Sequence, residues 1–145
     1  MKKQKRLRAF GMRRVRALFR IISFERGEDH EEKVLRVFAE RTPDVPEWFR
    51  SIRKGTMKQD FNKGIDFVIE TDVGKIFLQV KSSRHFAKEF RRGQAEGRYS
   101  GYIAVVVLDD DSITDQQVRA RILSRLSLVR NVFVERRHLA VSEGS

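Results

Sequence analysis

Three polar side chains of this 145-residue chain have types and spacing suited to chemistry at a phosphate: Asp66, Gln79 and Lys81. Carboxylate and carboxamide oxygens are hard ligands of the kind that Mg²⁺ prefers, and an ammonium group stabilises negative charge that develops on phosphate oxygens. These are residue types that can bind a hard cation and phosphate oxygens when they lie close together. The sequence offers no zinc site and no cysteine nucleophile, because the chain has no cysteine and its three histidines lie far apart in the sequence.

The three side chains belong to a predicted hairpin. Residues 65–70 and 75–81 each alternate between apolar and polar side chains, which is typical of strands, and the residues between them suit a turn. A two-residue and a four-residue loop at this turn both place Asp66 opposite Gln79, with Cβ atoms about 4.5–5.5 Å apart. Lys81 follows one pleat further on the same face. The register therefore gathers a carboxylate, a carboxamide and an ammonium group at one end of the hairpin.

The same face has a plainer alternative interpretation. It could be the solvent-exposed side of an amphipathic hairpin, on which Glu70 and Lys75 form a surface ion pair of little energetic value. Val68 and Phe77, which the register places opposite each other, make half of that face apolar and indicate that another element covers it. The donor-rich residues 82–85 directly after the second strand would suit phosphate oxygens.

The remaining pattern predicts the elements that position this hairpin. They are a helix over 28–41, a strand or helical turn over 48–54, a polar loop over 57–64, a helix over 84–95, a buried strand over 102–108 and a short last strand over 132–134. Thr114 and Gln117 form a capping-box signature that predicts another helix before the last strand. The apolar stripe of that helix consists of Val118, Ile122, Leu126 and Val129. This order predicts an α/β domain with a central mixed sheet flanked by helices.

Positive charge is concentrated at the start of the chain. Of the net charge of +11, residues 1–26 carry +9, from ten Lys and Arg and one Glu, so the rest of the chain is nearly neutral. Such a basic arm favours a polyanionic partner, and we expect DNA first, with RNA as the alternative. Membrane-surface binding, an organelle-targeting segment and a merely solvated extension remain open interpretations of the arm. No stretch is apolar enough over sufficient length to span a bilayer, and we expect a cytoplasmic or nucleoid-associated protein.

The hairpin also carries a resemblance to a known family. Gly64-Ile65-Asp66, a twelve-residue gap and Gln79-Val80-Lys81 resemble the active-site signature of the PD-(D/E)XK nuclease superfamily, which includes type II restriction enzymes and archaeal Holliday-junction resolvases. The predicted element order is compatible with the restriction-endonuclease-like αβββαβ core of that superfamily. The chain then divides into a basic arm over 1–26, a nuclease-like domain over 27–139 and a frayed tail over 140–145.

The resemblance implies a role for each residue of the signature. Asp66 would be the metal-binding aspartate, Gln79 would take the place of the second acid, and the carbonyl of Val80 would join them. Lys81 would be the lysine of the motif, and Glu31 resembles the helix-borne acid of resolvase-type members, with Glu28 and Glu32 as fallbacks. The implied cofactor is Mg²⁺, with Mn²⁺ as a substitute.

The resemblance further implies an endonuclease that hydrolyses DNA phosphodiester bonds, structure-specific in some members, and a homodimer. Gln79 is neutral where the family carries an acid, so a nucleic-acid-binding module on the same fold that does not cleave is the alternative. The residues that we expect to contact nucleic acid are Lys63, Ser82, Ser83 and Arg84 near the motif and Arg13, Arg14 and Arg16 in the arm.

Overall fold

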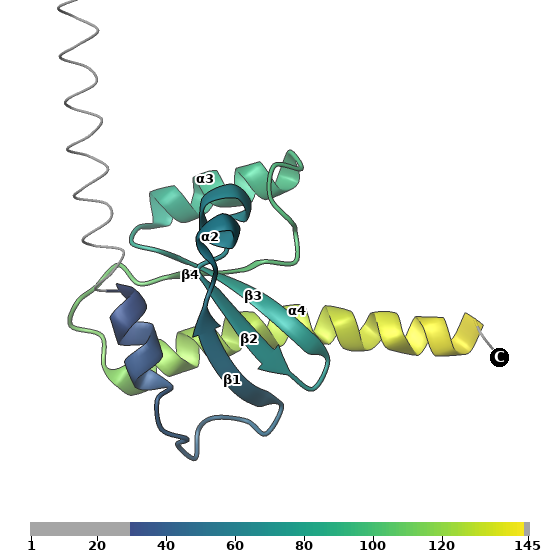
Figure 1. Ribbon diagram of the computed structural model, residues 1–145, viewed down its shortest axis with the longest axis horizontal. Helices are drawn as coiled ribbons and strands as arrows, with labels where there is room; N and C mark the ends of the chain where they lie inside the picture. The colour runs from purple at the N-terminus through teal and green to yellow at the C-terminus, as the bar shows by residue number, and fades with distance from the viewer. Residues whose placement is uncertain (1–29, 144–145) are drawn as a thin grey trace, which may run out of the picture.

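The computed structural model describes residues 30–143, apart from the side chains of 60–62 and 143. A helical segment over 30–37 comes first. It is followed by β1 (Phe49–Lys54), α2 (Met57–Lys63), β2 (Phe67–Thr71), β3 (Gly74–Lys81), α3 (Arg84–Ala95), β4 (Ala104–Val107) and α4 (Asp115–Glu143). The four strands form one sheet in the order β1-β2-β3-β4 (Figure 1). The sheet is mixed, because β1, β2 and β3 are antiparallel neighbours whereas β4 runs parallel to β3.

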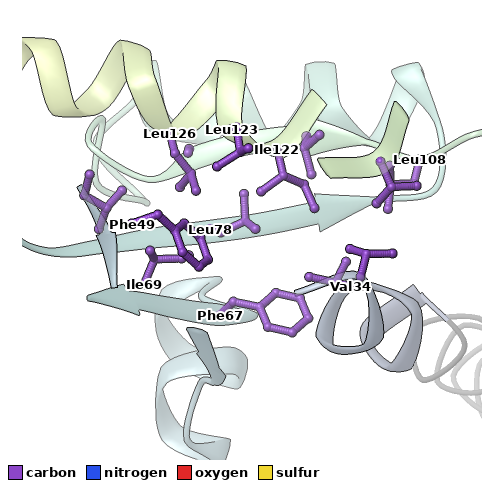
Figure 2. Packing of buried hydrophobic residues seen from close by; sticks show 14 of the residues in the cluster. Val34, Phe49, Phe67, Ile69, Leu78, Leu108, Ile122, Leu123 and Leu126 are labelled. Atoms are coloured by element: carbon purple, nitrogen blue, oxygen red, sulfur yellow. The ribbon is translucent and has the colours of Figure 1, made fainter. Parts of the chain in front are cut away.

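Helices cover both faces of this sheet, as expected for an α/β domain. On one face, α4 and the helical segment 30–37 pack against alternate side chains of β2 and β3 (Figure 2). The residues at the centre of this main cluster include Val34, Phe67, Ile69, Leu78, Ile122 and Leu126. On the other face, α3 contributes Ala87 and Phe90 to a smaller cluster. The parallel connection from β3 through α3 to β4 therefore supplies the cover of the second face.

The predicted hairpin register is confirmed. Val68 pairs with Phe77 and Glu70 with Lys75, so alternate residues point to opposite faces as expected. The half-apolar face is covered at its apolar pair, because Val68 is fully buried and Phe77 packs beside it in the cluster under α3. At the turn, the Thr71 hydroxyl donates to the Gly74 carbonyl oxygen at 2.7 Å. Glu70 and Lys75 stand 4.0 Å apart as the expected surface pair.

Helix α2 occupies residues where we predicted a loop. Thr56 accepts a hydrogen bond from the Gln59 N–H, and the Gln59 side chain accepts one from the Thr56 N–H, which forms a complete capping box. Gly64 ends the helix with a φ of +67°, a left-handed conformation that favours glycine. A polar sequence thus forms a helix because both of its ends are capped.

Three further expectations need correction near the ends of the domain. Residues 132–134 are not a strand, because they lie within α4, and Phe133 packs against the main cluster from that helix. Helix α4 also continues through 140–143, which we assigned to the tail, and Figure 1 shows it running beyond the sheet. The first helix ends at residue 37 rather than at residue 41. Phe38 follows the helix, and its ring stacks on the Phe49 ring with ring centres 4.7 Å apart.

Other expectations are met. Segment 48–54 resolves to strand β1, α3 spans the predicted range, and β4 lies within the predicted buried strand. Thr114 and Gln117 form their capping box, and the predicted stripe of α4 lies in the main cluster. Within residues 30–143, no helix is long and apolar enough to cross a membrane.

An ion pair fastens α4 to the turn of the hairpin. Arg130 donates two hydrogen bonds to the Asp72 carboxylate, at 2.8 and 2.7 Å, and its guanidinium lies 5.4 Å from the Trp48 ring centre. The hydrogen bonds from Arg130 hold the pKa of the Asp72 carboxyl below its ordinary value. The bidentate geometry ties three separate segments together.

We predict that Asp72→Asn lowers the free energy of unfolding at neutral pH and that its effect disappears in acid. The pKa of Asp72 is lowered in the folded state, so its contribution is present above the unfolded pKa and is lost as the pH falls through the folded pKa. Urea unfolding of wild type and variant across an acidic pH series measures the difference. Asp111→Asn, at an exposed aspartate, is the control; a pH-independent effect of Asp72→Asn would contradict the prediction.

Candidate functional site

Asp66 lies immediately before β2, where the backbones of three segments meet. Its N–H donates to the Leu78 carbonyl at 2.9 Å, and its own carbonyl accepts from the Gly55 N–H at 2.7 Å. Its carboxylate oxygen Oδ2 accepts from the Val80 N–H at 2.8 Å. The regular pairing of β2 with β3 extends to Phe67 and Leu78 at this end of the hairpin and does not include Asp66. Asp66 and Gln79 therefore do not form the predicted ladder pair. The carboxylate instead reaches the backbone of β3 one residue beyond Gln79.

Gln79 is buried in the middle of the sheet, with 7% of its surface exposed. Its carbonyl oxygen Oε1 is fully buried and has no hydrogen-bond partner among the described residues. Leaving a buried acceptor without a partner costs about 1–3 kcal/mol. A buried oxygen in this condition requires a partner such as a water molecule or a cation. The metal-ligand role of Gln79 stays a prediction.

Lys81 ends β3 on the same face as Gln79, which is the face covered by α3. Its ammonium nitrogen lies 5.2 Å from the ring centre of Phe90, within range of a cation–π interaction. Phe90 stacks on Tyr99, with ring centres 4.4 Å apart. In the part of the chain that the structure describes, Lys81 forms no ion pair with a carboxylate. Its charge is thus held by aromatic rings and remains available to an anion.

Gly64 connects the signature to this aromatic stack. A Cβ atom on Gly64 would lie 2.6 Å from Cε2 of Phe90 and 3.3 Å from Cδ1 of Tyr99. Only glycine fits here, because the position combines a positive φ with this close approach. Gly64 therefore has two roles. It ends α2, and its lack of a side chain lets the rings of Phe90 and Tyr99 pack close to the start of the hairpin.

Glu31 lies on the helical segment 30–37 and is 22% exposed. Its Oε2 atom forms an ion pair with the Lys54 ammonium at 3.2 Å. Lys54 is the last residue of β1, and the next residue, Gly55, donates to the Asp66 carbonyl. Glu31 thus approaches the Asp66 end of the sheet but is already neutralised by a lysine. The fallback Glu32 is exposed, and Glu28 lies outside the described residues.

The predicted nucleic-acid contacts have different local roles. The Ser83 hydroxyl accepts from the Phe86 N–H and caps α3, so Ser83 has a structural task at this point. Ser82 is half-buried, and Lys63 is exposed in the last turn of α2. Arg84 is almost fully exposed, 4.0 Å from the carboxylate of Asp109. Arg13, Arg14 and Arg16 lie outside the described residues.

Sequence reasoning missed the aromatic and basic surroundings of Lys81. Phe86 and Phe90 lie one helical turn apart on α3, and Arg98 and Tyr99 follow the helix. These residues line a cavity beside Lys81. The available signal was the pair of phenylalanines interleaved with basic residues over 84–92. Aromatic and basic side chains in this combination are typical of surfaces that bind single-stranded nucleic acid.

The donor set is suited to a hard cation only in part. No group of three His, Cys, Asp or Glu side chains within residues 30–143 could hold a metal ion. Asp66 and Gln79 nevertheless offer side-chain oxygens, and the unpartnered Gln79 oxygen fits a cation that prefers neutral and anionic oxygen ligands. These two oxygens are of the type that Mg²⁺ accepts, and Mg²⁺ usually takes only one or two protein carboxylates beside substrate phosphates.

Comparison with known proteins gives no family for this chain. No protein-family model, curated protein or solved structure matches it.

We predict that Gln79→Met raises the free energy of unfolding of the metal-free protein by about 1–3 kcal/mol, because it removes a buried acceptor that has no partner while conserving side-chain length. Urea unfolding in the presence of EDTA measures this change. Gln94→Met is the matched control, because the Gln94 amide donates to the Ser100 and Ile103 carbonyls and its loss should destabilise the fold. Equal destabilisation by both substitutions would show that the Gln79 oxygen does have a partner.

Proposed function

We propose that this protein is a metal-dependent nuclease that hydrolyses phosphodiester bonds in DNA. The observation that carries the proposal is the buried Gln79 oxygen without a partner, on the strand whose backbone holds the Asp66 carboxylate. The resemblance of this signature to the PD-(D/E)XK superfamily supports the same chemistry. The element order around the mixed sheet is compatible with the restriction-endonuclease-like core. We therefore include that core in the proposal.

Each residue of the site would contribute through its own chemistry. Asp66 and Gln79 would hold Mg²⁺, or Mn²⁺ in its place, and the Val80 carbonyl and Glu31 are the further oxygens that the resemblance assigns. The cation, when bound, polarises the scissile phosphate and lowers the pKa of a coordinated water molecule. The Val80 N–H fixes the orientation of the Asp66 carboxylate through its hydrogen bond. The Lys81 ammonium would stabilise the negative charge that the phosphate gains in the transition state.

A second candidate function rests on a specific observation. Gln79 is neutral, and Glu31 is engaged with Lys54, which leaves Asp66 as the main anionic ligand of the signature. A site with so little negative charge favours a module that binds nucleic acid on this fold without cleaving it. Both functions place a polyanion against Lys81, and they differ only in whether a phosphodiester bond is broken.

We predict that wild-type protein cleaves plasmid, single-stranded or four-way-junction DNA with Mg²⁺ or Mn²⁺ and that Asp66→Asn abolishes cleavage. Asn keeps an oxygen for the Val80 N–H but removes the charge that holds the cation. Lys81→Met should lower the rate constant of cleavage by about 10²–10³, the usual effect of removing one stabilising donor. Gel assays of product formation measure both effects.

Lys75→Met is the matched control for the lysine substitution, because Lys75 lies on the same strand at the other end of the hairpin and forms a surface pair with Glu70. Its cleavage rate should equal that of wild type. Unchanged cleavage in both Asp66→Asn and Lys81→Met would refute the site assignment. Binding without cleavage on every DNA substrate would favour the non-cleaving module, and cleavage of RNA alone would change the substrate.

We predict that the basic arm supplies affinity that is independent of sequence. Replacing Arg13, Arg14 and Arg16 by Gln should weaken DNA binding and make the slope of log K against log salt concentration shallower by about 0.9 for each phosphate that the arm no longer neutralises. Fluorescence anisotropy with a labelled duplex at several salt concentrations measures the slope. An unchanged slope, together with weaker binding to anionic vesicles, would assign the arm to a membrane surface instead.

A further inference from the structure

A cavity of about 350 Å³ opens beside Lys81, between α3 and the turn that follows it. This volume lies within the range of about 300–1,000 Å³ that is typical of small-ligand sites. The cavity adjoins the candidate site through Lys81 but contains neither Asp66 nor Gln79. Binding of a cation by Asp66 and Gln79 therefore does not account for the residues that line this cavity.

Aromatic rings form one part of the lining. Phe90 and Tyr99 are stacked with an interplanar angle of 17°, and they are backed by Gly64 and Gly93, on which any Cβ atom would come within 2.7 Å of a ring carbon. These two rings make a rigid wall. Phe86 differs from them, because it is 51% exposed although it is a large apolar side chain on the first turn of α3. An exposed aromatic ring at the mouth of a cavity offers a surface on which a planar group can stack.

Positive charge forms the other part of the lining. Lys81, Arg92 and Arg98 contribute cationic groups, and the lining carboxylate is that of Glu89. Arg98 is also paired with Glu96 at 3.0 Å, so three cationic groups stand against two carboxylates. The Glu89 carboxylate is 3.2 Å from the imidazole of His85, so its charge is partly shared. The cavity thus combines a half-exposed aromatic ring, which contacts His85 at a ring-centre distance of 5.7 Å, with an excess of cations. A nucleic acid strand combines flat bases with a phosphate for each nucleotide, and proteins bind unpaired strands through this pairing of stacking and charge.

We propose that this cavity binds one unpaired nucleotide of a nucleic acid strand, with its base stacked on Phe86 and its flanking phosphates on Arg92, Arg98 and Lys81. The inference deepens the proposed function and rests on it for the placement of the strand at Lys81. Bases inside a duplex are stacked on each other and do not reach such a cavity without being extruded. The protein would therefore prefer substrates with unpaired nucleotides, such as single strands or branch points, over continuous duplex.

The test uses the full chain and a fluorescein-labelled oligo(dT), with EDTA present so that no metal-dependent step takes part. Phe86→Leu should weaken binding of oligo(dT) by about 5- to 100-fold, because stacking of one base on an aromatic ring is worth this much. The loss should persist at raised salt, since stacking does not depend on counterion release whereas the contribution of the arm does. Fluorescence anisotropy measures the affinity, and circular dichroism checks that the variant is folded.

Matched controls separate stacking from general charge. Arg98→Gln should weaken binding of oligo(dT), whereas Arg91→Gln, an exposed arginine of α3 outside the cavity, should have a smaller effect. On an abasic strand of the same length, wild type and Phe86→Leu should bind equally. Free dTMP should compete only weakly, because it lacks the contacts of a strand; an affinity for dTMP equal to that for oligo(dT) would overturn the assignment to a strand.

Failure of this inference can be told apart from failure of the proposed function. Wild-type affinity of Phe86→Leu for oligo(dT), or an equal loss on the abasic strand, would overturn the nucleotide cavity even when cleavage depends on Asp66. A Phe86-dependent affinity for oligo(dT) supports the cavity, and it does so even where no metal yields cleavage, in which case the nuclease proposal alone fails.

Discussion

The pairing of β2 with β3 is the constraint on which the rest of the structure depends, because this hairpin packs against a hydrophobic cluster on each of its two faces. A one-residue slip of β3 would turn Gln79 and Lys81 into the main cluster beneath α4. Burying an unpaired ammonium group there would cost several kcal/mol. The packing that excludes Lys81 from the main core is thus the same packing that places it on the α3 face, beside the stacked rings.

The polar end of the hairpin differs from the rest of the sheet in how its buried polar atoms are hydrogen-bonded. Elsewhere the sheet buries apolar side chains, and its other buried polar side chain, Thr71, is hydrogen-bonded. Gln79 alone leaves an oxygen without a partner in the described part of the chain. Local violations of this kind concentrate at functional sites, because binding requires groups that the fold itself has not satisfied. The Asp66 carboxylate, by contrast, is oriented by the backbone of β3, which suits a ligand that must be held in place.

Features that depend on neighbouring residues could be predicted from the sequence. The register followed from alternation and turn length, and the start and stripe of α4 followed from Thr114, Gln117 and helical spacing. Helix α2 was missed because its polar sequence has no apolar periodicity, so that its capping box was the main signal. The pairing of Glu31 with Lys54 and the stacking of Phe90 on Tyr99 depend on how distant segments meet, which no local pattern encodes.

The charges around the candidate site explain how so few acidic ligands could serve a nuclease. Glu31 is paired with Lys54, and Asp66 and Lys81 contribute one charge of each sign, so the formal charges of these four side chains sum to zero. A divalent cation would then leave the site positive, which suits a phosphodiester that gains negative charge as it reacts. Under the proposed function, such a site would bind the cation weakly by itself and more strongly once a substrate phosphate supplied the missing oxygens. Cation and nucleic acid would therefore bind cooperatively, and the +9 arm, which raises the local concentration of phosphate, would promote metal binding as well as substrate binding.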